Sequence, residues 1–266
     1  MKTQPIFQVD AFTAQAFGGN PAGVCVLSGA APEKWMRSVA AEMNLAETAF
    51  LHRDGGVWRL RWFTPRVEID LCGHATLASA HILWETGVAA PEELLRFATR
   101  SGELTAERRG EWTELDFPAT PAQPVEPPAG LLEALGVRAT FTGRSRFDYV
   151  VEVETEAEVR ALKPDFTRLR QVESRGTVVT ARGAGEYDCV SRFFAPQVGI
   201  DEDPVTGSAH CMLAPYWAAK LGRNELRAFQ ASERGGELRL RVLGDRVRLG
   251  GQAVTTLRGE LLVPPA

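Results

Sequence analysis

The spacing of hydrophobic residues in the first half of the chain predicts a series of strands interrupted by two helices. Short apolar runs bounded by glycine, proline and asparagine are typical of strands, and they occur at residues 7–12, 22–27, 48–52 and 57–63. Apolar residues at helical spacing follow Pro32 as far as Met43 and predict an amphipathic helix. The alanine-rich segment 73–84 is almost wholly apolar, so we predict a buried helix there.

The second half of the chain repeats this order of elements. They are a strand at 149–153, a helix at 156–162, strands at 177–181 and 187–194, and an alanine-rich apolar helix at 207–220. After this helix, residues 238–243 and 247–249 predict a hairpin, and residues 257–263 predict a last strand. Each half is therefore expected to be a β-rich α+β unit built around one buried helix.

A proline-rich segment lies between the two halves. Within residues 117–130, prolines occupy positions 118, 121, 124, 127 and 128. Proline lacks a backbone N–H and cannot continue a helix or an inner strand. We therefore predict that this segment is the linker between two domains.

A direct repeat in the sequence indicates that the halves arose by duplication. The segment RWFTPRVEID at residues 61–70 and the segment RFFAPQVGID at residues 192–201 are identical at six of ten positions. LCGHA follows the first copy, and VTGSA follows the second after three additional residues. Both turns precede a predicted helix, whose first N–H groups attract an anion such as a substrate carboxylate. The sequence alone is also compatible with a duplication that serves packing only.

Composition and charge exclude several classes of protein. The 266 residues carry a formal net charge of −4 with acidic and basic residues interspersed, which gives no reason to expect nucleic acid as a partner. No signal peptide or membrane-spanning segment is evident, and the four cysteines form no CxxC pair, so we expect a reduced, cytoplasmic protein. We predict neither a metal nor an organic cofactor, since no closed ligand cluster and no GxGxxG motif occurs.

Four longer motifs resemble those of a known family. They are FGGNPAGV, MNLAETAFL, FTPRVEIDLCGHAT and DEDPVTGSAH, and in order and spacing the chain resembles the PhzF-like family, named for phenazine biosynthesis protein F. The resemblance implies the diaminopimelate epimerase fold, with two pseudo-symmetric α+β domains, each a β-sheet wrapped around a central helix, and a site between them. It also implies that the last strand returns to the first domain. The predicted domains are residues 1–118 with about 257–266, and residues 129–256. A homodimer is expected from the resemblance alone.

The resemblance also implies which residues act. Family members isomerise a small carboxylated substrate without a cofactor, and the glutamate of NLAET carries the proton. The implied catalytic residues are Glu47, His74 and Asp203, and the implied substrate-binding residues are Gly73, Gly207 and Ser208.

Physical chemistry supports these residue types. Moving a proton within one molecule requires a group that takes the proton and returns it, and a carboxylate in an apolar site suits this task. The second half has Gly176 near the position that corresponds to Glu47, so there is one candidate base and not a symmetric pair. The helix dipole disfavours a charged His74, which is therefore expected to be neutral. Asp203 lies in the apparent three-residue insertion and is expected to orient His74 or bind substrate, and Ser208 is expected to cap its helix or contact substrate.

Three alternatives remain at this point. Epimerases of the wider superfamily use two opposed cysteines, but this chain pairs Cys72 with Thr206, whose hydroxyl cannot replace a thiolate base. Hydroxyproline dehydratases also pair cysteine with threonine and would use Cys72. The third alternative is a non-catalytic family member that binds a small carboxylated metabolite. We expect an isomerase.

Overall fold

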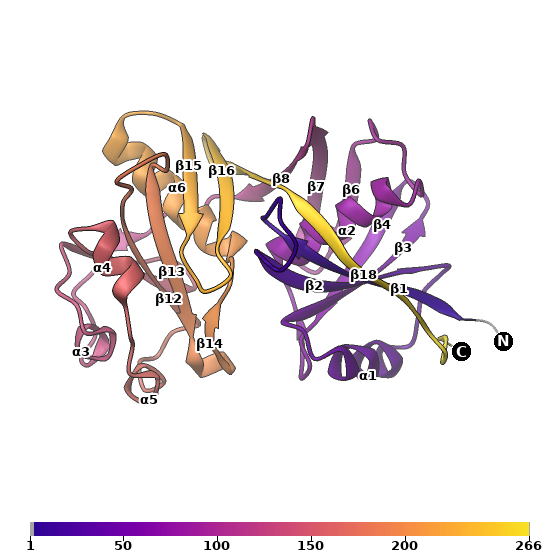
Figure 1. Ribbon diagram of the computed structural model, residues 1–266, viewed down its shortest axis with the longest axis horizontal. Helices are drawn as coiled ribbons and strands as arrows, with labels where there is room; N and C mark the ends of the chain where they lie inside the picture. Colours follow the sequence, from indigo (N-terminus) through magenta and orange to yellow (C-terminus); the bar gives the residue numbers. More distant parts are fainter. Residues whose placement is uncertain (1–2, 266) are drawn as a thin grey trace. The chain divides into compact units, whose positions relative to one another are not determined.

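The computed structural model describes residues 3–265 and divides the chain into two compact units. The first unit comprises the residues up to Asp116 together with the residues from Gly250 onward, and the second unit is Phe117–Leu249 (Figure 1). Both units consist mainly of strands with few helices. No helix within residues 3–265 is long and apolar enough to cross a membrane.

In the first unit, strands surround one apolar helix. Its elements are β1 (Gln4–Ala11), β2 (Asn20–Leu27), α1 (Glu33–Met43), β3 (Glu47–Asp54), β4 (Val57–Phe63), β5 (Glu68–Ile69), α2 (Gly73–Glu85), β6 (Leu95–Thr99), β7 (Gly102–Arg109), β8 (Trp112–Pro118) and β18 (Ala253–Leu261). Helix α2 contacts β1, β2, β3 and β18, and all but two of its residues are buried. Helix α1 lies outside these strands (Figure 1), and it buries only Met36, Val39 and Ala40. This difference matches the predicted apolar and amphipathic helices.

The second unit has the same plan. Its elements are β9 (Gln123–Pro124), α3 (Leu131–Leu135), β10 (Phe141–Arg144), β11 (Asp148–Glu152), α4 (Glu156–Ala161), α5 (Phe166–Leu169), β12 (Gly176–Arg182), β13 (Cys189–Ala195), η1 (Pro196–Val198), β14 (Ile200–Asp203), α6 (Gly207–Leu221), β15 (Glu225–Gln230), β16 (Gly236–Leu243) and β17 (Arg246–Gly251). Most residues of α6 are buried, so this helix has the same role as α2.

The pairing of strands repeats from one unit to the other. In the first unit β2 runs parallel to β3, β3 is antiparallel to β4, and β4 runs parallel to β6 across α2. In the second unit β11, β12, β13 and β15 pair in the same senses, with α6 between the last two. This shared topology agrees with the duplication that the sequence repeat predicts.

The proline-rich segment is not a free linker. Its backbone is hydrogen-bonded within the second unit: the N–H of Ala119 donates to the carbonyl of Asp245, that of Thr120 to Cys211, and that of Val125 to Thr142. Proline cannot supply these donors, but the residues between the prolines can. The segment thus forms part of the second unit, where β9 pairs with β10.

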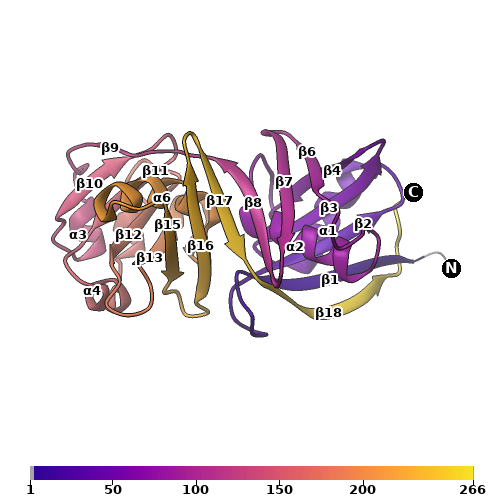
Figure 2. The same ribbon diagram turned by 90° about the horizontal axis from the view of Figure 1, so that it is seen from above.

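The last strand begins earlier than predicted. Strand β18 starts at Ala253 and not near Leu257, and it pairs antiparallel with β1 over the whole length of β1. The C-terminal segment therefore completes the sheet of the first unit (Figure 2). The alternation of apolar and polar residues is weak in β18, whose residues are half-buried or exposed, which explains why its start was missed.

Candidate active site

The start of helix α2 is held in place by an ion pair a few residues upstream. Arg61 binds the carboxylate of Glu68 through two hydrogen bonds of 2.7 and 2.6 Å, and the Glu68 side chain is nearly inaccessible to solvent. A two-point contact of this kind fixes orientation as well as distance. From there the chain reaches Cys72, which is extended (φ −144°, ψ 110°) and serves as the N-cap residue of α2.

Glu47 is brought to this helix start by the strand order. Strand β3 begins at Glu47, and its parallel register with β2 sets Glu47 beside Ala22. Helix α1 ends at Asn44, whose left-handed conformation (φ 50°) terminates the helix shortly before the strand. Glu47 is only 7% exposed. The motif NLAET is therefore the end of a helix followed by a strand, as the sequence predicts, and its glutamate is buried.

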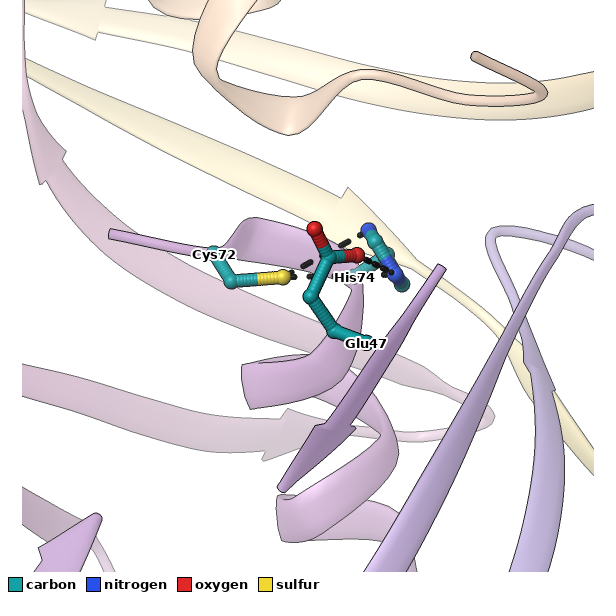
Figure 3. A group of neighbouring side chains, drawn as sticks. All are labelled: Glu47, Cys72 and His74. Atoms are coloured by element: carbon teal, nitrogen blue, oxygen red, sulfur yellow. Dashed lines mark hydrogen bonds and ion pairs between the residues drawn. The ribbon is translucent and has the colours of Figure 1, made fainter. Parts of the chain in front are cut away.

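Glu47, Cys72 and His74 point toward one another (Figure 3). Nε2 of His74 lies 3.0 Å from Oε2 of Glu47, and the amide nitrogen of Asn20 lies 3.2 Å from Nδ1 of the same imidazole. The distance to Glu47 is that of an ion pair. Apart from this contact, Oε2 of Glu47 accepts no hydrogen bond among residues 3–265. A carboxylate oxygen has more than one lone pair, so Oε2 can accept a further hydrogen bond from a ligand.

The surroundings of His74 favour its charged form. Burial alone would lower the pKa of this imidazole, but the neighbouring Cys72 sulfur and Glu47 carboxylate outweigh burial and hold the pKa well above its usual value of 6.5. The direction of this pKa opposes the prediction of a neutral His74, which stays a prediction because the share from Cys72 requires a thiolate there. That prediction considered only the helix dipole, which is a partial charge, and omitted the full charge of Glu47, which reaches His74 from another strand.

Cys72 is close to His74 but is a poor base. Its sulfur lies 3.6 Å from Nδ1 and 3.9 Å from Nε2 of His74. Burial is the largest influence on this thiol and raises its pKa from the usual value of 9.0, so the neutral thiol is the favoured form.

The donor atoms of Cys72, His74 and Glu47 all lie within 4.8 Å of one another, and such a group of side chains could hold a metal ion.

In the second unit, a buried glutamine organises the equivalent turn. Oε1 of Gln230 accepts a hydrogen bond from the N–H of Thr206 (2.9 Å), and Nε2 donates to the carbonyl of Asp203 (2.7 Å). The Thr206 hydroxyl donates to Oδ2 of Asp203 at 2.5 Å. Thr206 therefore serves as a donor to a carboxylate, which agrees with the inference that it cannot act as a base.

The position of Asp203 corrects one prediction. Asp203 pairs with Phe193 in β13 and β14, as Ile69 pairs with Trp62 in β4 and β5. Asp203 thus corresponds to Ile69 and does not lie in an insertion. The three additional residues lie earlier, where η1 (Pro196–Val198) precedes β14. The Ile-Asp pair that ends both copies of the repeat gave a misleading sequence alignment. Strand pairing, and not residue identity, determines which residues of the two units are structurally equivalent.

Ser208 does not cap its helix. Thr206 is the N-cap residue of α6, and Oγ of Ser208 instead accepts a hydrogen bond of 3.0 Å from Nη2 of Arg175. Arg175 also binds the carboxylate of Asp148, which is 2% exposed, with Nε 2.8 Å from Oδ1. The Asp148–Arg175 pair therefore holds the Ser208 hydroxyl. Gly207, like Gly73 in the first unit, is the first residue of its helix.

The second unit has no counterpart of Glu47, and its packing leaves no room for one. Strand β12 begins at Gly176 as β3 begins at Glu47. A Cβ atom at Gly176 would lie 2.2 Å from the ring of Phe193, so any side chain there would displace a buried aromatic residue. The predicted asymmetry between the halves therefore has a steric cause.

The structure groups the predicted residues in two sets and adds others. In the first unit Glu47 contacts His74, next to Gly73 at the start of α2. In the second unit Asp203 contacts Thr206, and Gly207 and Ser208 follow Thr206 at the start of α6. The sequence analysis missed Asn20, Arg175 and Gln230. Asn20 stands inside the motif FGGNPAGV, which was a usable signal, but Arg175 and Gln230 lie outside all four motifs and gave none.

The chain shares its fold with PhzF family and epimerase-like structures. A PhzF family structure from Enterococcus faecalis superposes with a TM-score of 0.95 at 41% identity, covering 98% of this chain and 100% of that one. A probable proline racemase from Agrobacterium radiobacter superposes with a TM-score of 0.65 at 12% identity, covering 99% and 94%, which shows a common fold only. The predicted diaminopimelate epimerase-like α+β fold is confirmed.

The family follows from the sequence match. Residues 9–259 match the family model described as phenazine biosynthesis-like protein (PhzC-PhzF), and the chain belongs to this family. A relative named as an uncharacterized isomerase from Halalkalibacterium halodurans is 55% identical over 265 residues, covering 99% of this chain and 100% of the relative. The chain is an isomerase, as predicted.

Proposed function

We propose that this isomerase moves a proton within a small carboxylated substrate without a cofactor, and that Glu47 carries the proton. The observation that supports this most strongly is the state of the Glu47 carboxylate. It is buried, and Oε2 has no hydrogen-bond partner within residues 3–265. Its one close polar neighbour there is the His74 imidazole at 3.0 Å, and a carboxylate oxygen has lone pairs for more than one contact, so this atom is a good candidate for direct contact with substrate.

His74 is proposed to control the protonation of Glu47. The two side chains are 3.0 Å apart, and the charged imidazolium is favoured. An imidazolium stabilises the carboxylate before it accepts a proton from carbon, and it can share the proton until that proton is returned. Asn20 lies at Nδ1, where its amide, turned so that the oxygen accepts from the imidazolium N–H, is proposed to hold the ring so that Nε2 faces Glu47. His74 is therefore the acid–base partner and Asn20 a positioning residue.

Each unit is proposed to offer donors to a substrate carboxylate at the start of its buried helix. Neither Cys72 nor Thr206 caps its helix with a side-chain hydrogen bond, so the N–H groups of Gly73 and Gly207 are candidate donors to an anion. Ser208 is proposed as a further donor, oriented by Arg175. Asp203 accepts from Thr206 and is proposed as the second catalytic group, able to take a hydrogen bond from a substrate amine or hydroxyl.

Hydrogen exchange with solvent tests the proposal and separates an enzyme from a binding protein. The protein is incubated in D₂O with a panel of small carboxylates that carry an acidic C–H bond, and deuterium in the recovered compounds is measured by mass spectrometry. The proposal predicts deuterium at one carbon of at least one compound with wild-type protein and none with Glu47→Gln. Exchange that persists unchanged in Glu47→Gln, or a ligand that binds without any exchange, contradicts it. Ser208→Ala should weaken binding more than turnover.

A further inference from the structure

Three different metal-binding side chains meet at the proposed catalytic site. Glu47, Cys72 and His74 are each at most 7% exposed, and one donor atom from each lies within 4.8 Å of the others. No other group of three or more histidine, cysteine, aspartate or glutamate residues within residues 3–265 meets this criterion. We call these three residues the Glu–Cys–His group.

The distances in this group approach those of a tetrahedral zinc site. Zn–N and Zn–O distances of about 2.0–2.1 Å and a Zn–S distance of about 2.3 Å imply N···O and N···S separations of about 3.4 and 3.6 Å at the tetrahedral angle. The structure has 3.0 Å between Nε2 of His74 and Oε2 of Glu47, and 3.9 Å between Nε2 and Sγ of Cys72. These two separations differ from the tetrahedral values by a few tenths of an ångström, and the Glu47 oxygen and the Cys72 sulfur lie within 4.8 Å of each other.

The donor types select the class of cation. A thiolate, an imidazole and one carboxylate suit zinc and similar borderline ions, whereas magnesium and calcium prefer oxygen ligands alone. Asn20 supplies the outer contact that a metal-bound histidine requires, because its amide can turn its oxygen toward a protonated Nδ1. With three protein ligands, the fourth position would be taken by water, as in open zinc sites.

We propose that the Glu–Cys–His group is an inhibitory binding site for Zn²⁺. Binding removes one proton from the Cys72 thiol and one from Nε2 of the His74 imidazolium, releases both to solvent, and engages the Cys72 thiolate, Oε2 of Glu47 and Nε2 of His74 in bonds to the metal. This inference rests on the proposed function, since inhibition follows only if Glu47 and His74 exchange protons with substrate. The ion is a competitor of the substrate and not a cofactor.

Binding is measured first, because it requires no substrate. Chelator-treated, dialysed protein is titrated with Zn²⁺ by calorimetry and with Co²⁺ by absorption spectroscopy, which reports thiolate ligation as a near-ultraviolet charge-transfer band. One ion per chain is expected. Cys72→Ala and Glu47→Gln should each weaken zinc binding by about 100-fold, since even residues that only support a ligand contribute 10–100-fold. Cys25→Ala is the matched control, because Cys25 is buried in the same unit but outside the group.

The outcomes separate the two proposals. Absence of stoichiometric binding, or binding that Cys72→Ala and Glu47→Gln leave unchanged, overturns the metal site. If Cys72→Ala does not fold, the zinc affinity and the Co²⁺ spectrum of Glu47→Gln still test the metal site. If zinc binds the group as expected but Glu47→Gln retains wild-type turnover, the metal site stands and the proposed function fails. In active protein, Zn²⁺ at its binding concentration should abolish turnover, and chelator should restore it; undiminished turnover in zinc-saturated protein refutes the inhibitory role.

Discussion

Replacing Gln230 by alanine should destabilise the second unit, because this side chain is the internal support of the turn that precedes α6. Gln230 is fully buried. It makes three hydrogen bonds, of 2.9 Å from the Thr206 N–H, 2.7 Å to the Asp203 carbonyl and 3.2 Å to the Thr206 hydroxyl. The alanine variant removes all three hydrogen bonds, and the methyl group of alanine has no donor or acceptor to replace them.

The size of the effect follows from the groups that lose their Gln230 contact. A buried polar group that loses its partner costs about 1–3 kcal/mol, and two backbone groups are involved. Burial of one fewer methylene adds about 0.8 kcal/mol. Asp203 is partly accessible, so water can replace part of its contact. We therefore expect the free energy of unfolding of this unit to fall by about 2–4 kcal/mol.

Urea denaturation followed by fluorescence and circular dichroism measures this change. With an m-value of about 2 kcal/mol/M, the unfolding midpoint of the variant should fall by about 1–2 M. The control is Gln15→Ala, whose side chain is exposed and whose midpoint should not move. If the free energy of unfolding of Gln230→Ala falls by less than about 1 kcal/mol, comparable to the control, then these hydrogen bonds do not support the turn.

Three other perturbations have definite expected results. Cys72→Ala should keep turnover within about tenfold of wild type, because burial raises the pKa of Cys72 and leaves a neutral thiol that is a poor base; the variant should also resist thiol reagents, since it has no thiol beside His74 to modify. Complete loss of activity in folded protein favours a thiol base. Burial lowers the pKa of His210 from 6.5 to about 4, so the unfolded chain binds its proton first as pH falls. Its stabilising contribution is complete above pH 6.5 and should decrease by about 3 kcal/mol toward pH 4, a loss that denaturation curves of wild type and His210→Gln would reveal as a difference in pH dependence. Turnover should survive dialysis against a chelator, and a stoichiometric metal lost together with activity would contradict this.

Elements with a strong local pattern were predictable from the sequence. Helices α2 and α6 follow from apolar alanine-rich segments, and their observed bounds differ from the predicted ones by a single residue at the C-terminal end. Strands β6, β7 and β8 were not predicted. Strand β7 buries only Leu104 and Ala106 among charged and polar neighbours, so its periodicity is short and weak. Pairing with β6 and β8 determines this strand, and such pairing is not a local property.

Candidate site residues that lie in a sequence motif were predictable. Properties that depend on contacts between residues distant in sequence were not. The motif NLAET carried the prediction of Glu47, and the structure buries this side chain. The charge state of His74 depends on Glu47, which is far away in sequence and near in space. The correspondence of Asp203 with Ile69 depends on strand register. In both cases tertiary structure supplies the neighbour that decides the chemistry, and a single sequence does not display that neighbour.

The central claim, that Glu47 carries the proton, is tested most directly by the turnover of Glu47→Gln on a substrate identified by deuterium exchange. The amide keeps the size of the side chain but cannot act as a base near neutral pH. Its fold is checked by circular dichroism and its ligand affinity by calorimetry, and Glu42→Gln, an exposed glutamate on α1, is the matched control. We predict that Glu47→Gln binds ligand but turns over about 10²–10⁴-fold more slowly or worse, while Glu42→Gln is unchanged. A folded Glu47→Gln protein with turnover within about tenfold of wild type would contradict the claim.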